Sequence, residues 1–101
     1  MNLTIIDFGF NNIQTISPEI NKLQNLEKLY MNNNPVQYIP VELTECKKLS
    51  YIDLSNTYVK ILPREIILLR NLYYLKLENC PLHEKVQRIY DTGLPNLLEY
   101  F

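Results

Sequence analysis

Few residues of this chain have side chains that could carry out chemistry. His83 is the only histidine among the 101 residues, and it stands shortly after Cys80, so the two side chains could supply two ligands to a metal ion. A structural zinc site needs four ligands, and this segment does not complete the set. We therefore expect no metal and no cofactor, and we interpret His83 as a turn residue before a C-terminal helix.

The sequence does not indicate an enzyme. The chain has two glycines, so no Gly-rich loop could hold a phosphate group. Asp7 and Asp53 occupy equivalent places in the repeat described below, which would put these carboxylates about 10 Å apart in a solvated column. We predict no catalytic residues.

A repeat of 23 residues determines where these side chains lie. Leu3, Leu26, Leu49 and Leu72 each open the same pattern. Positions 1, 4, 6, 11, 14, 18 and 21 of the pattern are apolar throughout the first three units. In the first unit they are Leu3, Ile6, Phe8, Ile13, Ile16, Ile20 and Leu23. A fixed period of this length predicts a stacked array, because one unit alone cannot bury its apolar face.

The spacing within a unit also predicts local structure. Positions 4 and 6 fall on one face of a short strand, since strand side chains alternate. Position 9 is predicted to bond backbone groups and to link neighbouring units, and it holds Asn11, Asn34, Thr57 and Cys80. Pro40 and Pro63 suit the first turn of a short helical or 3₁₀ segment with apolar residues three apart.

The pattern LxxLxLxxNxLxxLPxxIxxLxxL resembles the leucine-rich repeat. It is similar to the 23-residue subclass of Ras-pathway scaffolds and related intracellular proteins, and the tail HEKVQRIYDTGLPNLLEYF resembles the helical cap of such arrays. The resemblance implies an α/β fold, a right-handed solenoid of about four repeats with a short parallel sheet on the concave side and a helical C-terminal cap. We expect one domain over 1–101, with repeats 3–25, 26–48, 49–71 and 72–82 and a cap over 83–101.

Charge and cysteine content limit the partners. The formal net charge is −1, which gives no basic surface for a phosphate backbone, so we expect no direct binding to nucleic acid. Extracellular leucine-rich repeat proteins resemble one another in having cysteine-rich end caps, whereas Cys46 and Cys80 both occupy positions of the repeat. With no visible signal peptide or long apolar run, we expect an intracellular, cytoplasmic protein without a membrane partner.

The positions that flank position 4 must point out of the sheet, and they predict a protein-binding face. Tyrosine offers a large contact area at low entropic cost. The candidate binding residues are Ile5, Asp7, Phe10, Lys28, Tyr30, Tyr51, Asp53, Tyr73, Tyr74 and Lys76. Alternatively, aromatic rings in these places simply pair across neighbouring strands. Tyr38, Ile61, Ile67 and Leu68 form a second candidate patch, which could equally pack against the cap.

The N-terminal end is a further candidate. The strand that contains Ile6 and Phe8 is predicted to be an open edge that docks on a partner or on a second copy. A frayed first repeat, or a chain cut from a longer protein, would explain the same pattern equally well. The sequence thus favours a non-catalytic adaptor or scaffold that binds an unidentified protein through its concave face and this edge. The alternative is a constitutive structural subunit of a large complex, including a ribonucleoprotein contacted through proteins.

Overall fold

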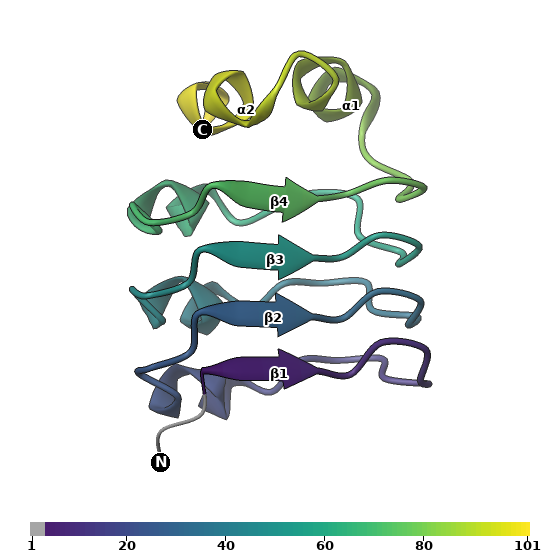
Figure 1. Cartoon of the computed structure of the whole chain (residues 1–101). Coiled ribbons are helices and arrows are strands. Elements are labelled where there is room, and N and C mark those ends of the chain that lie inside the picture. Colours follow the sequence, from purple (N-terminus) through teal and green to yellow (C-terminus); the bar gives the residue numbers. More distant parts are fainter. Residues whose placement is uncertain (1–3) are drawn as a thin grey trace.

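The chain folds into a stack of four similar coils. The computed structural model describes residues 4–101, so the prediction that Leu3 opens the first repeat lies outside the described residues. One parallel sheet is formed, in spatial order, by β1 (Ile5–Asp7), β2 (Lys28–Tyr30), β3 (Tyr51–Asp53) and β4 (Tyr74–Lys76). Figure 1 shows these strands stacked with two helices, α1 (Glu84–Tyr90) and α2 (Leu94–Tyr100), above β4.

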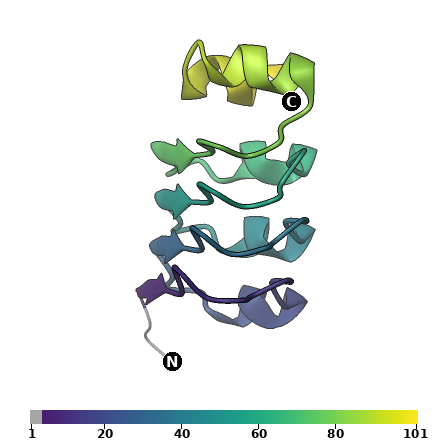
Figure 2. The same cartoon turned by 90° about the vertical axis from the view of Figure 1, so that its right-hand side faces the viewer.

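Three 3₁₀ helices form the second layer, behind the sheet. They are η1 (Pro18–Lys22), η2 (Val41–Glu45) and η3 (Arg64–Leu68), and Figure 2 shows them on the side opposite the strands. The predicted α/β solenoid with a helical C-terminal cap is therefore confirmed. Pro40 and Pro63 precede η2 and η3 as extended N-cap residues, which corrects their predicted place by one position. Their carbonyl groups accept the first hydrogen bond of each helix, from Leu43 and Ile66.

The strands pair without any shift in register, so equivalent positions lie side by side. Ile6 lies opposite Leu29, Leu29 opposite Ile52, and Ile52 opposite Leu75. All four of these side chains are buried in the core between the sheet and the 3₁₀ layer. Each position of the repeat consequently forms a straight column along the stack.

The first repeat is less buried than the inner ones. Phe8 was predicted as a core residue, but 46% of it is exposed, whereas its equivalent Leu54 is only 1% exposed. Ile20 and Leu23 are only partly buried, although their equivalents in the third repeat are fully enclosed. The reason is that Phe8 lies on the first coil, which within residues 4–101 is packed against another coil on one side only.

The predicted polar column at position 9 joins neighbouring coils. Asn34 is buried, accepts from Ile13 N–H at 3.0 Å, and donates to the carbonyl oxygens of Phe8 at 2.9 Å and Met31 at 3.0 Å. Cys80 Sγ donates to the Leu54 carbonyl oxygen at 3.0 Å and lies 3.3 Å from Thr57 Oγ1. These bonds satisfy backbone groups that the short strands leave unpaired.

A left-handed turn follows each strand at position 8. Asn33, Asn56 and Asn79 have φ of about 60°, which asparagine tolerates better than most residues. In the first repeat the same conformation (φ 61°) is adopted by Phe10. A bulky residue is unfavourable in this backbone region.

The cap closes the C-terminal end of the core. Val86 and Leu97 are buried against the last repeat. Tyr90 Oη accepts from Leu77 N–H at 2.9 Å and donates to Glu78 Oε2 at 2.5 Å. Burial, and then the hydrogen bond to Glu78, raise the pKa of Tyr90 to about 12. His83 is the N-cap residue of α1, as expected for a turn residue.

Candidate protein-binding surfaces

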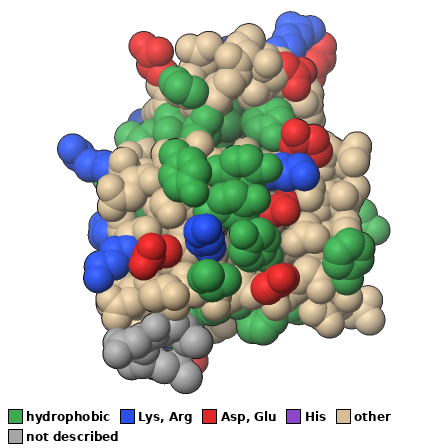
Figure 3. All heavy atoms as spheres, in the orientation of Figure 1, with side chains coloured by type: hydrophobic (Ala, Val, Ile, Leu, Met, Phe, Trp, Pro, Cys, Tyr) green, Lys and Arg blue, Asp and Glu red, His purple; other side chains and the backbone are tan. Residues whose placement is uncertain are grey.

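Four tyrosines form a continuous aromatic surface on the outer side of the sheet. We call Tyr30, Tyr51, Tyr73 and Tyr74 the tyrosine face. The rings of Tyr51 and Tyr74 are stacked, with centroids 4.2 Å apart and planes 4° apart. Tyr30 lies 5.1 Å and Tyr73 lies 6.5 Å from the Tyr51 ring. Figure 3 shows hydrophobic side chains gathered over the middle of the sheet.

This arrangement follows from the register of the strands. Tyr51 and Tyr74 are directly opposite in the β3–β4 pair, so their side chains leave the sheet next to each other. Tyr30 belongs to the neighbouring outward column, two residues on from Lys28, which pairs with Tyr51. The rings therefore do pair across strands, as the alternative interpretation held, and they nevertheless keep an exposed surface.

Charged residues of both signs surround the tyrosine face. Lys28 Nζ lies 5.8 Å from the centroid of the Tyr51 ring, a distance suited to a cation–π contact. Asp53 Oδ1 accepts hydrogen bonds from the backbone and the hydroxyl group of Ser55. Asp7 Oδ1 accepts from Gly9 N–H in the equivalent place of the first repeat. The face thus has an aromatic centre and a mixed polar rim, also visible in Figure 3.

The hydroxyl group of Tyr51 stays protonated at neutral pH. Partial burial, and then a hydrogen bond with Tyr74, raise its pKa above the ordinary value. Tyr51 therefore presents a hydroxyl group that can both donate and accept hydrogen bonds.

The other predicted residues lie around this centre. Ile5, Asp7 and Lys76 share the outward face of the strands with the tyrosines. Phe10 does not: it lies beyond the end of β1 in the column of left-handed turns, and it is 78% exposed. The sequence pattern therefore placed nine of the ten residues on or beside the strands and one in the turn that follows.

A second groove lies away from the sheet face. Its volume is about 360 Å³, and its lining includes Tyr38, Tyr58 and Ile61. Tyr58 was not among the predicted residues, because the same position of the preceding repeats holds the non-aromatic residues Asn12 and Pro35. Ile61 also lines a groove with the cap residues Tyr100 and Phe101. Ile67 and Leu68 are exposed on η3 and line neither groove. In the predicted second patch, Tyr38 and Ile61 therefore line a groove, whereas Ile67 and Leu68 lie apart from it on η3.

The third candidate surface is an open hollow of about 730 Å³ at the N-terminal end of the stack, which we call the end groove. Most of its lining is apolar, and Glu19 and Lys22 of η1 contribute the charges. The lining residues are Ile6, Phe8, Ile13, Thr15, Ile16, Ser17, Glu19, Ile20, Lys22, Leu23, Leu29 and Met31.

Known sequences and structures identify the architecture. The family described as Leucine Rich repeats (2 copies) matches residues 2–45. A leucine-rich repeat protein from Leptospira interrogans superposes on 92% of this chain, with a TM-score of 0.78 and 23% sequence identity. The chain has the leucine-rich repeat fold. No curated protein sequence matches it significantly.

Two further solved structures are similar to this chain. An internalin from Listeria monocytogenes matches 73% of the chain at 15% identity, with a TM-score of 0.64. The ectodomain of the Arabidopsis thaliana receptor kinase GASSHO1/SCHENGEN3 matches 78% at 24% identity, with a TM-score of 0.62. The chain covers only 30%, 21% and 13% of the three structures, so these similarities concern the fold alone.

The leucine-rich repeat fold is a common protein-interaction module, and proteins of this type are typically non-catalytic. Within residues 4–101, no cluster of three or more histidine, cysteine or acidic side chains is arranged to hold a metal ion. No helix of the described part is long and apolar enough to cross a membrane.

Proposed function

We propose that this leucine-rich repeat protein is a non-catalytic adaptor or scaffold that binds another protein through its tyrosine face, with its N-terminal edge as a second contact. The stacked pair of Tyr51 and Tyr74 carries this proposal. Two parallel rings offer a flat aromatic surface at the middle of an open sheet, and no second layer covers that side in the described residues. Aromatic side chains in such places dominate the energy of many protein interfaces.

The tyrosine face is also preorganised. Tyr30, Tyr51 and Tyr74 already restrain one another through ring contacts, so little side-chain entropy remains to be lost on binding. Lys28 and Asp53 at the rim would orient a partner more than they would add affinity. Four strands span only about 14 Å across the stack. A single copy therefore supports an interface of modest size and affinity.

The cysteines support an intracellular location in this proposal. Cys46 and Cys80 are buried free thiols. Cys46 Sγ donates to the Ile20 carbonyl oxygen at 3.3 Å, and burial raises its pKa, which disfavours the reactive thiolate. Both thiols serve as packing groups between coils, a role that suits a reducing compartment such as the cytoplasm.

Affinity purification from the native cell, followed by mass spectrometry, tests the proposal. The double variant Tyr51→Ala/Tyr74→Ala should lose the partner that co-purifies with the natural protein. Tyr38→Ala is the matched control, since it removes an exposed tyrosine away from the tyrosine face. If the double variant retained every partner, the tyrosine face would not be the binding surface.

The alternative function, a constitutive subunit of a large complex, is favoured by one observation. The end groove leaves apolar side chains of the first repeat exposed that are enclosed in the inner repeats. Permanent interfaces are typically more apolar than reversible ones. Exchange of the isotope-labelled chain into the purified complex distinguishes these two functions. A reversible adaptor should exchange within minutes, whereas a constitutive subunit should not.

A further inference from the structure

We propose that the segment of the partner protein that binds the tyrosine face carries an arginine side chain, which stacks on the Tyr30 ring between the carboxylates of Asp7 and Asp53. The inference rests on the proposed function and specifies the chemistry of the partner at that surface. It gives Tyr30 a role that differs from that of the stacked pair of Tyr51 and Tyr74.

The register of the strands places Tyr30 between two carboxylates. Asp7, Tyr30 and Asp53 are the last residues of β1, β2 and β3. Asp7 pairs with Tyr30, and Tyr30 pairs with Asp53. Paired residues of neighbouring strands lie about 4.8 Å apart, and their side chains leave the same side of the sheet. One carboxylate residue therefore lies on each side of Tyr30, at the same position along the strands.

Both carboxylates are held in place by the turns that follow them. Asp7 Oδ1 accepts from Gly9 N–H at 3.0 Å. Asp53 Oδ1 accepts from Ser55 N–H at 3.0 Å and from Ser55 Oγ at 2.7 Å. Within residues 4–101, the second oxygen atom of each carboxylate has no hydrogen-bond partner. A carboxylate with a fixed orientation and an open oxygen atom is a preorganised acceptor for a charged donor.

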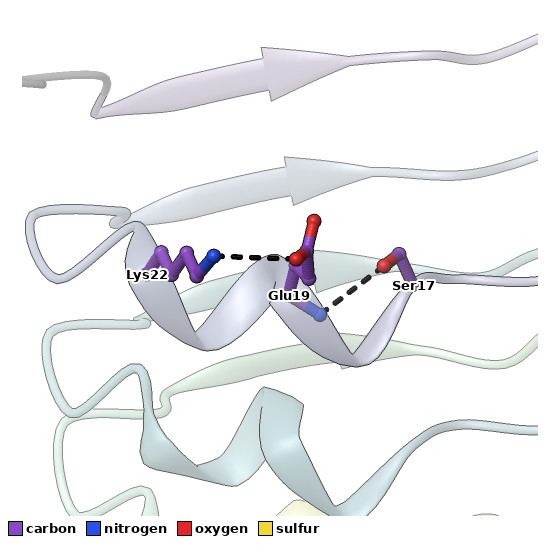
Figure 4. A network of polar contacts seen from close by, with 3 residues as sticks. All are labelled: Ser17, Glu19 and Lys22. Atoms are coloured by element: carbon purple, nitrogen blue, oxygen red, sulfur yellow. Dashed lines mark hydrogen bonds and ion pairs between the residues drawn. The ribbon is translucent and has the colours of Figure 1, made fainter.

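The chain does not neutralise these two carboxylates. Glu19, by contrast, forms an ion pair of 3.2 Å with Lys22 of the same helix, as Figure 4 shows. In the described part of the chain, no lysine or arginine nitrogen lies within 4.0 Å of a carboxylate oxygen of Asp7 or Asp53. The ends of the first three strands are therefore negatively charged, which is complementary to a positively charged group of the partner.

Tyr30 is the ring of the tyrosine face that remains open to a cation. The face of an aromatic ring attracts positive charge, and Lys28 Nζ already lies 5.8 Å from the centroid of the Tyr51 ring. Tyr51 also contacts the rings of Tyr73 and Tyr74. The Tyr30 ring contacts only the Tyr51 ring, at an angle of 43°, and within residues 4–101 no lysine or arginine lies over it. Its cation would therefore come from the partner.

Two lysines direct this cation to Tyr30 rather than to the centre of the tyrosine face. Lys28 lies beside the Tyr51 ring. Lys76 pairs with Asp53 from the β4 side, so it lies on the far side of Asp53 from Tyr30. Both lysines repel a positive group that approaches the stacked rings, whereas the two carboxylates attract it to Tyr30.

The geometry favours arginine over lysine. A guanidinium group is planar, so it can stack flat on a ring while the N–H groups at its edge donate to carboxylates. Asp7 and Asp53 are two strand spacings apart, about 10 Å between their backbones. A guanidinium group over Tyr30 would lie between them, donate to one carboxylate and be attracted by the other. An ammonium group is a compact point charge and cannot stack in this way.

Selection of random peptides displayed on phage, with the full chain as the target, tests the inference. Peptides that also bind the Tyr51→Ala/Tyr74→Ala variant are removed, so that the remaining peptides depend on the tyrosine face. These peptides should be enriched in arginine. Titration of a synthetic copy, followed by fluorescence polarisation, then measures its affinity. Replacing its arginine by citrulline, which has nearly the same shape without the charge, should weaken binding about tenfold. Replacement by lysine should weaken binding about threefold.

Variants of the chain locate the arginine. Asp7→Asn/Asp53→Asn removes both charges but keeps an oxygen atom that can accept from Gly9 and Ser55. It should weaken binding of the arginine peptide about tenfold and barely affect the citrulline peptide, because the two changes remove the same interaction. Tyr30→Leu should also weaken the arginine peptide more than the citrulline peptide.

A matched control removes two carboxylates elsewhere. Glu45→Gln/Glu99→Gln makes the same change of net charge at exposed positions of η2 and α2, and it should leave the affinity unchanged. Peptides that depend on Tyr51 and Tyr74 without enrichment in arginine would overturn the inference and leave the proposed function standing. So would an arginine peptide that binds the Asp7→Asn/Asp53→Asn variant as tightly as the natural chain. If no selected peptide depended on Tyr51 and Tyr74, the result would count against both.

Discussion

The side-chain amide of Asn34 donates to the carbonyl oxygen of Phe8, 2.9 Å away and one coil earlier in the stack. The same side chain accepts from the N–H group of Ile13. One buried amide thus binds the first coil on both sides of its turn. It connects the least buried repeat to the fully enclosed second one.

Replacing Asn34 should therefore lower the free energy of unfolding by more than the size of its side chain suggests. Asn34→Ala would leave Ile13 N–H and the Phe8 carbonyl group without this partner, and we expect a loss of about 2 to 3 kcal/mol in the free energy of unfolding. Urea denaturation measures the change. Asn11→Ala is the matched control, because Asn11 holds the same position but is exposed and bonds only within its own turn. Equal losses in the two variants would contradict a special role for Asn34.

The two ends of the core should differ in their response to truncation. Ile66→Ala removes a side chain that is enclosed on all sides, and we expect a loss of about 3 to 4 kcal/mol. Ile20→Ala, at the equivalent position of the first repeat, should cost about half as much because Ile20 is only partly buried. Thermal and urea unfolding of both variants give the comparison.

Phe10 is predicted to reduce the stability of the isolated chain. Phe10→Asn would place in the left-handed turn the residue type that the other three turns use, and should raise the free energy of unfolding by about 0.5 to 1 kcal/mol. The reverse change in an equivalent exposed turn, Asn56→Phe, should lower it by a similar amount. If Phe10→Asn also weakened binding of the partner protein, the exposed ring would have a role that compensates for its unfavourable conformation.

Tyr90 should make stability depend on pH at the alkaline end. Its pKa is about 12 in the folded chain and about 10 when unfolded, so the folded state keeps the proton more tightly. Its contribution to stability is fully present below pH 10 and is lost as the pH rises from 10 toward 12. The difference in unfolding free energy between the natural chain and Tyr90→Phe should shrink over this range. Glu78→Gln removes the charged acceptor of the Tyr90 hydroxyl group. This variant should therefore narrow the pH range over which the contribution of Tyr90 to stability is lost.

The period of the sequence was sufficient to predict most of the fold. A spacing that never varies between Leu26, Leu49 and Leu72 requires a sheet without register shifts, and the pairing of Ile6, Leu29, Ile52 and Leu75 agrees. The outward direction of Tyr51 and Tyr74 followed from the alternation of strand residues. Their stacked rings could not be predicted, because ring orientation depends on side-chain rotamers and on neighbours in the next strand.

The turns and the ends were harder to predict from the sequence. Position 8 gave no sign that Phe10 would adopt a positive φ, since a column of asparagines is informative only once the turn geometry is known. Tyr58 was missed because it follows the polar column and no other repeat has an aromatic residue there. Phe8 fits the core pattern in sequence, and its exposure results from its place on the first coil rather than from its own residue type.

The unshifted register also determines how the chain would respond to a pulling force. Each coil is bonded only to the coil before it and the coil after it. A load applied between the two termini acts along the stack and falls on the bonds between two adjacent strands, three residues long, rather than on the whole sheet at once. The molecule should therefore lengthen under tension in discrete steps of one coil, at low force and starting from the first repeat, and shorten again coil by coil when the load is released.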